Sequence, residues 1–333
     1  MNTPRAGRPR AAARLLAAAV LAVSMPAPGA ARQLVELFPG YGNPNTLVIS
    51  GRVFDAPRAT RWGAGLAASR LAKPLGALVH LVRRGPGDRP VVVRAGGVAA
   101  EARPGPGGSF RVELPAAAGV QWSGEVKVTA VSGAGEACEG AAYVPNPAAK
   151  TGVISTFEET IAPGEGRGRY DGAAAPAVPG MPGLYARLAA DEERRLRPVC
   201  YVAARAGAAG APTVGFLSVH RFPPGPLLLM KPGPPGAAPP PAAAVYDHLL
   251  SSIQDLLAAW PEKKFVLFGA AGREDPDIFR CIAARYRARI RGVYLRRGGP
   301  RDAAREGAYP GFFFFDTAEE AANDLARKGL LRD

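Results

Sequence analysis

The sequence predicts an α/β domain built on a parallel sheet, preceded by a small all-β sandwich. Two changes of pattern along the chain support this fold class. Up to about Pro145 the chain has short alternating apolar runs broken by Gly and Pro, which are typical of a sandwich. After Lys150, apolar runs alternate with longer amphipathic segments, which indicates a parallel sheet covered by helices. A chain of 333 residues with 47% hydrophobic content can bury two such cores.

Residues 1–31 have the pattern of a secretory signal peptide. Four arginines and no acid precede an apolar run from Leu15 to Met25, and small residues follow as far as Ala31. A spanning helix needs roughly 20 apolar residues, so this run is too short to cross a membrane. A disordered tail and an uncleaved anchor are the alternatives. We expect export to the periplasm or the extracellular space of a bacterium, with no transmembrane span once the signal is removed.

The expected β-sandwich covers residues 32–147. Its strands are short runs in which apolar and polar residues alternate. They are predicted at Thr46–Phe54, Gly76–Val82, Val91–Arg94, Phe110–Leu114, Val126–Val131 and Ala141–Val144. One helix is expected at Ala64–Leu75, and Asn146–Lys150 is expected to be a linker.

The expected α/β domain covers residues 148–333. Strands are predicted at Gly152–Ser155, Pro198–Val202, Lys264–Phe268 and Ile290–Leu295, and helices at Gly183–Glu193, Val245–Ala259, Asp277–Arg285 and Thr317–Leu330. Two Gly-, Ala- and Pro-rich stretches, Ala162–Val178 and Lys231–Ala244, are predicted to be surface loops. Ligands of such sheets bind at the carboxyl ends of the strands, so candidate site residues are sought there.

The chain is strongly basic, with a formal net charge of +14. Several arginines gather in one stretch, at positions Arg280, Arg285, Arg287, Arg289, Arg291, Arg296, Arg297, Arg301 and Arg305. They could face anionic lipid headgroups or nucleic acid, but a solvated basic face is the favoured interpretation. Among partners, an anionic lipid or membrane surface and a protein are retained, and no nucleic acid is expected.

The three cysteines, Cys138, Cys200 and Cys281, are widely spaced and form no CxxC pair. With only three histidines in the chain, neither a zinc site nor a disulfide framework is predicted. A single bridge between one pair of these cysteines remains open.

Val153-Ile-Ser-Thr-Phe-Glu-Glu-Thr-Ile161 is the most informative segment, because an apolar strand here runs into a polar cluster with two acids and a Thr. It resembles the Ile-Ser-Asp-Ile-Asp-Asp-Thr-Ile signature of the phosphatidate phosphatase family first known from a fungal actin-patch protein and widespread in bacteria. Further pieces in matching order are Pro179–Tyr185, Phe222–Leu229, Trp260–Gly269, Asp275–Phe279, Val293–Arg296 and Asp316–Ala321. The resemblance implies a haloacid-dehalogenase-like fold for the second domain.

The resemblance also implies a reaction. The family transfers phosphate to an aspartate nucleophile, a second aspartate protonates the leaving oxygen, and Mg²⁺ lies between carboxylates and phosphate. In this chain Thr156 stands at the nucleophile position and Glu158 at the position of the acid, while Thr160 matches the family. Glu159 is expected to point away from the side shared by Thr156 and Glu158, because side chains alternate along an extended chain.

The remaining family positions have also lost their functional groups. Ala203 replaces a phosphate-holding serine, Leu249 a lysine and Ala270 the aspartate that binds the metal. Arg205 is a candidate substrate-binding residue, since guanidinium suits phosphate. His248 is then expected on a helix surface, and Asp275 matches the family.

These substitutions predict a catalytically inactive pseudophosphatase that binds an anionic lipid or a protein partner, with no metal ligands and no cofactor. The alternative is an active Mg²⁺-dependent phosphatase of phosphatidate or another lipid phosphate that uses Glu158 or Glu159 as a non-standard carboxylate.

Overall fold

The computed structural model describes residues 32–56, 89–133, 135, 137–162, 172–190, 197–206, 210–231 and 240–331. Residues 31–333 form one compact unit that contains two sheets. The predicted signal peptide, the helix expected at Ala64–Leu75 and the strand expected at Gly76–Val82 lie outside the described residues. No helix in the described part of the chain is both long enough and apolar enough to span a membrane.

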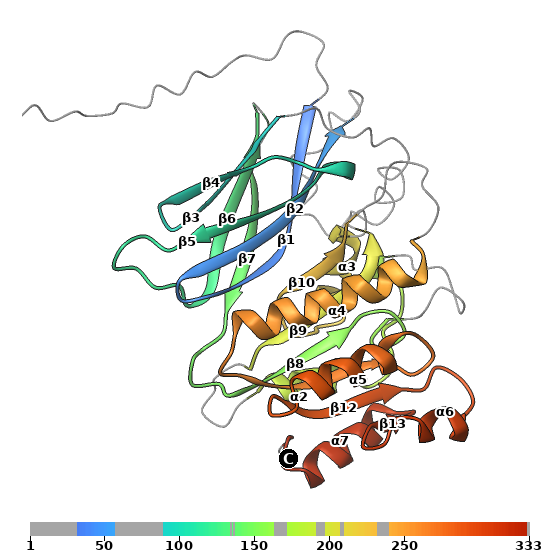
Figure 1. Cartoon of the computed structure of the whole chain (residues 1–333). Helices are drawn as coiled ribbons and strands as arrows, with labels where there is room; N and C mark the ends of the chain where they lie inside the picture. The colour runs from blue at the N-terminus through green and yellow to red at the C-terminus, as the bar shows by residue number, and fades with distance from the viewer. Residues whose placement is uncertain are drawn as a thin grey trace, which may run out of the picture. The chain divides into compact units, whose positions relative to one another are not determined.

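The first sheet has seven strands in the order β4-β3-β6-β7-β1-β2-β5. Their bounds are β1 Arg32–Asn43, β2 Thr46–Ala56, β3 Val91–Ala95, β4 Val98–Ala102, β5 Ser109–Pro115, β6 Gly124–Ser132 and β7 Cys138–Val144. All neighbours pair antiparallel except β1 and β7, which pair parallel. Figure 1 shows this sheet in blue to green.

The first sheet corrects the expected sandwich. A sandwich has two stacked sheets, whereas these strands form one sheet whose edge strands β4 and β5 approach each other, so the sheet is nearly a barrel. Strand β1 contains a bulge, because the register of its pairing with β2 shifts between Phe38 and Tyr41. A Cβ on Gly40, inside that bulge, would lie 2.7 Å from the Val48 carbonyl oxygen, so only glycine fits there. Alternation alone could not distinguish two stacked sheets from one curved sheet.

The second sheet has six parallel strands in the order β10-β9-β8-β11-β12-β13. Their bounds are β8 Thr151–Thr156, β9 Val199–Ala206, β10 Leu227–Met230, β11 Lys264–Ala270, β12 Ile290–Arg296 and β13 Phe313–Phe315. This confirms the expected parallel sheet. The short strands β10 and β13 were not predicted, because three or four residues show too little periodicity.

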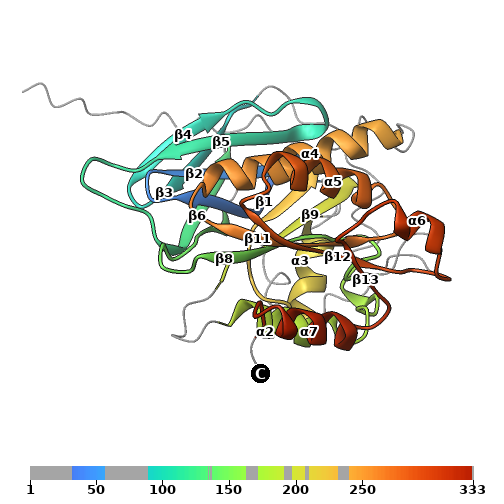
Figure 2. The ribbon, with the colours of Figure 1, turned by 60° about the horizontal axis from the view of Figure 1, so that its bottom comes forward.

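Helices cover both faces of the parallel sheet (Figure 2). Their bounds are α2 Met181–Ala189, α3 Gly210–Val219, α4 Ala242–Ala259, α5 Asp275–Arg285, α6 Ala303–Gly307 and α7 Ala318–Arg327. One buried cluster packs α2, α3 and α7 on one face, and another packs α4 and α5 on the other. Helix α4 begins at Ala242, within a stretch that was predicted to be a loop, and α3 was not predicted.

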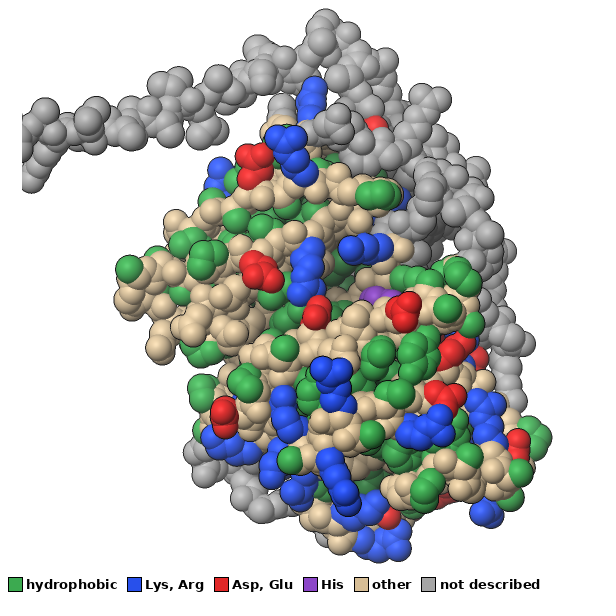
Figure 3. All heavy atoms as spheres, viewed as in Figure 1, with side chains coloured by type: hydrophobic (Ala, Val, Ile, Leu, Met, Phe, Trp, Pro, Cys, Tyr) green, Lys and Arg blue, Asp and Glu red, His purple; other side chains and the backbone are tan. Residues whose placement is uncertain are grey.

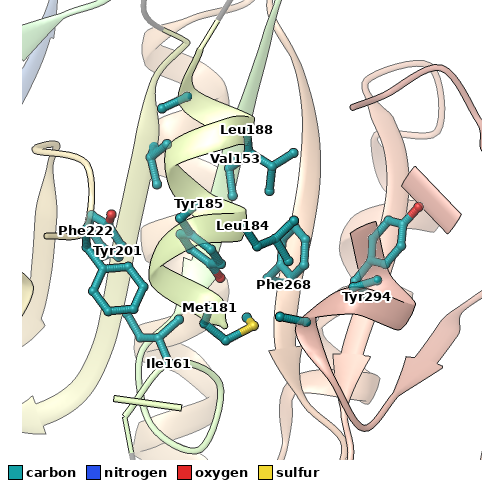
Figure 4. Close-up of a cluster of buried hydrophobic side chains, with 14 of the residues drawn as sticks. Val153, Ile161, Met181, Leu184, Tyr185, Leu188, Tyr201, Phe222, Phe268 and Tyr294 are labelled. Carbon is teal, nitrogen blue, oxygen red and sulfur yellow. The ribbon is translucent and has the colours of Figure 1, made fainter. Parts of the chain in front are cut away.

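Helix α2 illustrates how the sheet is covered. Leu184, Tyr185 and Leu188 are buried against the strands, together with Val153 and Phe268 (Figure 4). The Tyr185 hydroxyl lies 2.6 Å from the Ser155 hydroxyl, so even the polar atoms of this interface are paired. This apolar face packs α2 onto the strand that ends at Thr156.

Candidate functional site

The candidate site lies where the chain reverses its direction of travel across the parallel sheet. From β8 the chain moves outward to β9 and β10, and it then returns to β11 on the opposite side of β8. The carboxyl ends of the neighbouring strands β8 and β11 therefore meet at a topological switch point, which is where ligands of such sheets bind. Thr156 ends β8 and Ala270 ends β11, so two of the predicted site positions meet there.

Thr156, at the nucleophile position, takes part in a closed hydrogen-bond network. Its hydroxyl donates to Asp275 Oδ2 at 2.6 Å and lies 2.8 Å from the Thr160 hydroxyl. Because Thr156 has one hydroxyl hydrogen and Asp275 accepts it, Thr160 donates to Thr156. Asp275 Oδ2 also accepts the backbone N–H of Ala270 at 2.7 Å. The three side chains are at most 3% exposed.

Asp275 is a buried carboxyl in this network. Burial raises its pKa from the ordinary value of 3.8 to about 7, against the opposing effect of the hydrogen bonds from Thr156 and the Ala270 N–H. Among the described residues no cation forms an ion pair with it. The sequence showed Asp275 as a family match but not its contact with Thr156, which brings together residues that are 119 positions apart.

Glu158, at the position of the acid, is 6% exposed. Its Oε2 accepts the backbone N–H of Ala204 at 3.1 Å, so the carboxylate is turned toward the end of β9. Ala203, the replaced serine, is fully buried in the same strand. Glu158 is therefore close to the strand that should hold phosphate, but the side chain at position 203 offers no hydroxyl.

Glu159 lies in a tight turn rather than in an extended strand. Strand β8 ends at Thr156, and Glu159 has a φ of +60°, which is rare for a residue with a side chain. Alternation along an extended chain therefore does not apply to it. Its carbonyl oxygen accepts Arg296 Nε at 2.5 Å, and its carboxylate lies 3.5 Å from Arg273 NH1.

Arg273 and Arg296 are site residues that sequence reasoning missed. Arg273 belongs to the loop between β11 and α5, and Arg296 ends β12. A Cβ placed on Gly272 or on Gly298 would lie 3.6 Å from Glu159 Oε2, so both loops approach the Glu159 turn closely. A guanidinium group directly after the paired glycines of the β11–α5 loop was the available signal.

Leu249 and His248 are on α4, away from the Thr156 network. Leu249 is 3% exposed and packs in the core between α4 and the sheet, which explains why an apolar residue is accommodated at this position. His248 was predicted on the helix surface and is half-buried, with its Nε2 3.0 Å from the Ala203 carbonyl oxygen. Burial lowers the His248 pKa, partly offset by hydrogen bonds to the carbonyl groups of Ala203 and Leu228.

The remaining sequence candidates are Arg205 and the three cysteines. Arg205 lies in β9, but its side chain is outside the described part of the structure. All three cysteines are free: Cys200 is buried, Cys138 is half-buried and Cys281 is exposed. The open question of a single disulfide is thereby answered for this structure.

The residues present do not fit a Mg²⁺ ion of the kind that the family uses. Hard oxygen ligands must converge on one point. Here Asp275 Oδ2 is taken by a hydroxyl and an N–H, Glu158 Oε2 is taken by the Ala204 N–H, and positions 156 and 270 carry no carboxylate. No group of three His, Cys, Asp or Glu side chains with metal-binding geometry exists among the described residues.

The fold and site define a protein with a parallel α/β sheet and a polar cluster at its switch point. Residues 170–297 match the family model described as "Phosphatidate phosphatase APP1, catalytic domain". This match confirms the family resemblance indicated by the motifs. It begins after the segment from Thr156 to Thr160, so it concerns the fold that surrounds the site rather than the nucleophile strand.

Two solved structures with detectable similarity are distant from this chain in sequence. A chain of the Pnkp1/Rnl/Hen1 complex is 16% identical with a TM-score of 0.31, over 47% of this chain and 49% of that chain. This chain thus spans about half of that relative. A putative alpha amylase from Salmonella typhimurium is 12% identical with a TM-score of 0.25, over 80% and 52% of the two chains. No curated protein sequence matches.

Proposed function

We propose that this chain is an exported member of the phosphatidate phosphatase family that has lost phosphatase activity and binds an anionic lipid or a protein partner. One observation carries the proposal: the side chain at the nucleophile position, Thr156, is 3% exposed and donates its hydrogen bond to the buried Asp275. A nucleophile must reach phosphorus, and this hydroxyl is directed into the protein.

The other family positions support the same conclusion. Ala203, Leu249 and Ala270 are all buried and have no functional group that could hold phosphate or metal. Loss of a nucleophile alone can cost on the order of 10⁶ in rate, and here three further parts are absent. Since the ligand positions do not fit Mg²⁺, we propose that no cofactor is required.

A second candidate function is a hydrolase of phosphatidate or a related lipid phosphate. The observation in its favour is the 2.6 Å contact between Thr156 and Asp275, because a carboxyl with a pKa of about 7 is suited to general-base catalysis near neutral pH. Glu158 and Glu159 are less suitable as nucleophiles. Glu158 is held by the Ala204 N–H, and Glu159 is paired with Arg273.

The deciding experiment is a phosphatase assay of the full chain with Mg²⁺, using phosphatidate in mixed micelles and a chromogenic phosphate monoester. We expect no release of phosphate above that of a buffer control. We also expect the Thr156→Asp/Ala270→Asp variant to gain Mg²⁺ binding, which isothermal titration calorimetry would measure. Wild-type turnover that disappears in Glu158→Gln or Asp275→Asn would overturn the proposal in favour of the hydrolase.

Export is tested separately. If the full chain is expressed in a bacterial host and the periplasmic fraction is collected, N-terminal sequencing should find a mature end close to residue 32. Recovery of the intact amino terminus in the cytoplasm would contradict export without affecting the argument about catalysis.

A further inference from the structure

A basic groove lies at the opposite end of the parallel sheet from Thr156. It is located between the start of β12 and the end of α7 and has a volume of about 380 Å³. Three cations and three apolar residues line it: Arg287, Arg291, Lys328, Ala288, Ile290 and Leu330. Because parallel strands have all their amino ends at one edge, this groove and the candidate site occupy opposite edges of the same sheet.

The structure separates these cations from the rest of the arginine-rich stretch. Most arginines of that stretch are bound to acids or to carbonyl groups, namely Arg280 to Asp277, Arg289 to Leu257, Trp260 and Lys263, Arg296 to Glu159, Arg297 to Glu306 and Asp316, Arg301 to Glu306 and Arg305 to Arg273. Arg287 and Arg291 are exposed, and neither forms an ion pair within the described part of the chain.

Lys328 is held in place at the groove. Its ammonium group lies 2.7 Å from Asp324 Oδ2 and 5.3 Å from the ring centre of Tyr294. Asp324 is also bound by Arg327 at 2.9 Å and by the Tyr294 hydroxyl at 2.9 Å. One carboxylate is thus shared between two cations, and its charge does not neutralise the groove.

We propose that this groove is a binding site for a phosphate group. Guanidinium groups pair with phosphate oxygens through parallel hydrogen bonds, and Arg287 and Arg291 are available for such pairing. A phosphate monoester carries a charge of about −1.5 to −2 at neutral pH, which complements the excess of cations. The apolar side chains of Ile290 and Leu330 would contact the organic part of the molecule that carries the phosphate.

Further cations surround the groove. Figure 3 shows Lys and Arg side chains gathered over the part of the molecule that carries α5, β12 and α7. The phosphate could come from a lipid headgroup in a bilayer or from a small soluble molecule. The proposal does not depend on the proposed function, since none of the groove residues belongs to the Thr156 network.

The test compares two variants of the full chain that lose the same charge. Arg287→Gln/Arg291→Gln removes the two groove cations that form no ion pair with another described residue. Arg94→Gln/Arg103→Gln removes two exposed arginines, one in β3 and one directly after β4. Each cation near an anionic bilayer contributes about 1 kcal/mol, which is about a fivefold effect on binding. At low salt we therefore expect the groove variant to bind about 30-fold more weakly than the wild type to phosphatidylcholine vesicles that contain phosphatidate. The control variant should bind the phosphatidate vesicles with an affinity within about twofold of the wild type. Neither variant should bind vesicles of pure phosphatidylcholine.

A second arm identifies the source of the phosphate. Inorganic phosphate and glycerol phosphate are titrated into the wild type and the groove variant, and binding is followed by calorimetry. Binding of the soluble phosphate alone, lost in the groove variant, supports the site and assigns it to a soluble ligand. Equal weakening of both variants, tighter binding of single-stranded RNA than of either phosphate source, or no binding of any phosphate source would overturn the proposal.

Discussion

The polar side chains at the two edges of the parallel sheet differ in burial and in hydrogen bonding. At the carboxyl edge, Thr156, Thr160 and Asp275 are buried and bind one another. At the amino edge, Arg287 and Arg291 are exposed without ion pairs among the described residues. Ligands of parallel sheets usually bind at the carboxyl edge, but here the polar side chains of that edge hydrogen-bond to one another. The exposed cations Arg287 and Arg291 are at the amino edge instead. The difference shows that the polar groups at the carboxyl edge are satisfied within the protein, whereas two arginines at the amino edge are exposed.

The two buried aspartates among the described residues of this domain, Asp275 and Asp324, extend the comparison. Asp275 at the carboxyl edge forms no ion pair with another described residue, and burial raises its pKa to about 7. Asp324, near the amino edge, is partly protected from solvent as well, but its contacts with Lys328, Tyr294 and Arg327 outweigh burial and lower its pKa. Protonation of Asp275 therefore favours the folded state, whereas protonation of Asp324 disfavours it.

The largest expected effect is the pH dependence contributed by Asp275. A carboxyl whose pKa is higher in the folded state stabilises the fold below its unfolded pKa, and this contribution is lost as the pH rises through about 7. From pH 4 to pH 8 the loss amounts to about 4 kcal/mol, at 1.36 kcal/mol per pKa unit. Urea unfolding of the wild type and of Asp275→Asn should diverge over this range, the variant being the more stable at pH 8. Parallel curves would contradict the assigned burial of the charge.

The next effect comes from adding charge to the carboxyl edge. Thr156→Asp places a second carboxyl against Asp275, and at pH 8 we expect a loss of about 3 kcal/mol, because an uncompensated buried charge is costly. Thermal unfolding would measure it, with Thr156→Ser as the control that keeps the hydroxyl. In Thr156→Asp/Ala270→Asp, millimolar Mg²⁺ should restore much of the loss. A stable Thr156→Asp without metal would indicate that the network is open to solvent.

At the amino edge, Arg289 holds the fold together, whereas Arg287 and Arg291 are exposed. Substitution of each should therefore affect stability differently. The Arg289 guanidinium donates to the carbonyl groups of Leu257, Trp260 and Lys263, which ties the end of α4 to the start of β11. Arg289→Ala should cost about 2 kcal/mol in urea unfolding, since several half-buried carbonyl groups lose their donor. Arg287→Ala and Arg291→Ala, as matched controls, should stay within about 0.5 kcal/mol of the wild type.

The smallest effect concerns Asp324. Asp324→Asn removes the charge that Lys328 and Arg327 share, and we expect a loss of about 1 kcal/mol at pH 7, because these partners are largely exposed and screened by solvent. Since its folded pKa is lowered, the wild-type contribution is present above its unfolded pKa and is lost on acidification. The difference between wild type and variant in urea unfolding should therefore vanish at acidic pH. A difference that grows on acidification would reverse the assigned sign.

Periodicity predicted the long elements and missed the short ones. The strands β8, β9, β11 and β12 and the helices α4, α5 and α7 were predicted within a few residues, because each buries one continuous apolar face. Strand β13 has three residues, and its pairing with β12 rather than its own pattern makes it a strand. The single curved sheet formed by β1 to β7 also depends on pairing, including the parallel contact of β1 with β7.

The sequence by itself determined the family resemblance and the parallel sheet, since these follow from the order and identity of residues. It also predicted, from the resemblance, that Thr156, Ala203, Leu249 and Ala270 stand where the family has functional groups. Only the tertiary structure decided which residues contact Thr156 and where exposed cations gather. The hydrogen bond from Thr156 to Asp275 spans 119 positions, and the basic groove brings α7 next to β12. Such contacts depend on how the strands are ordered in the sheet, and local sequence carries no record of that order.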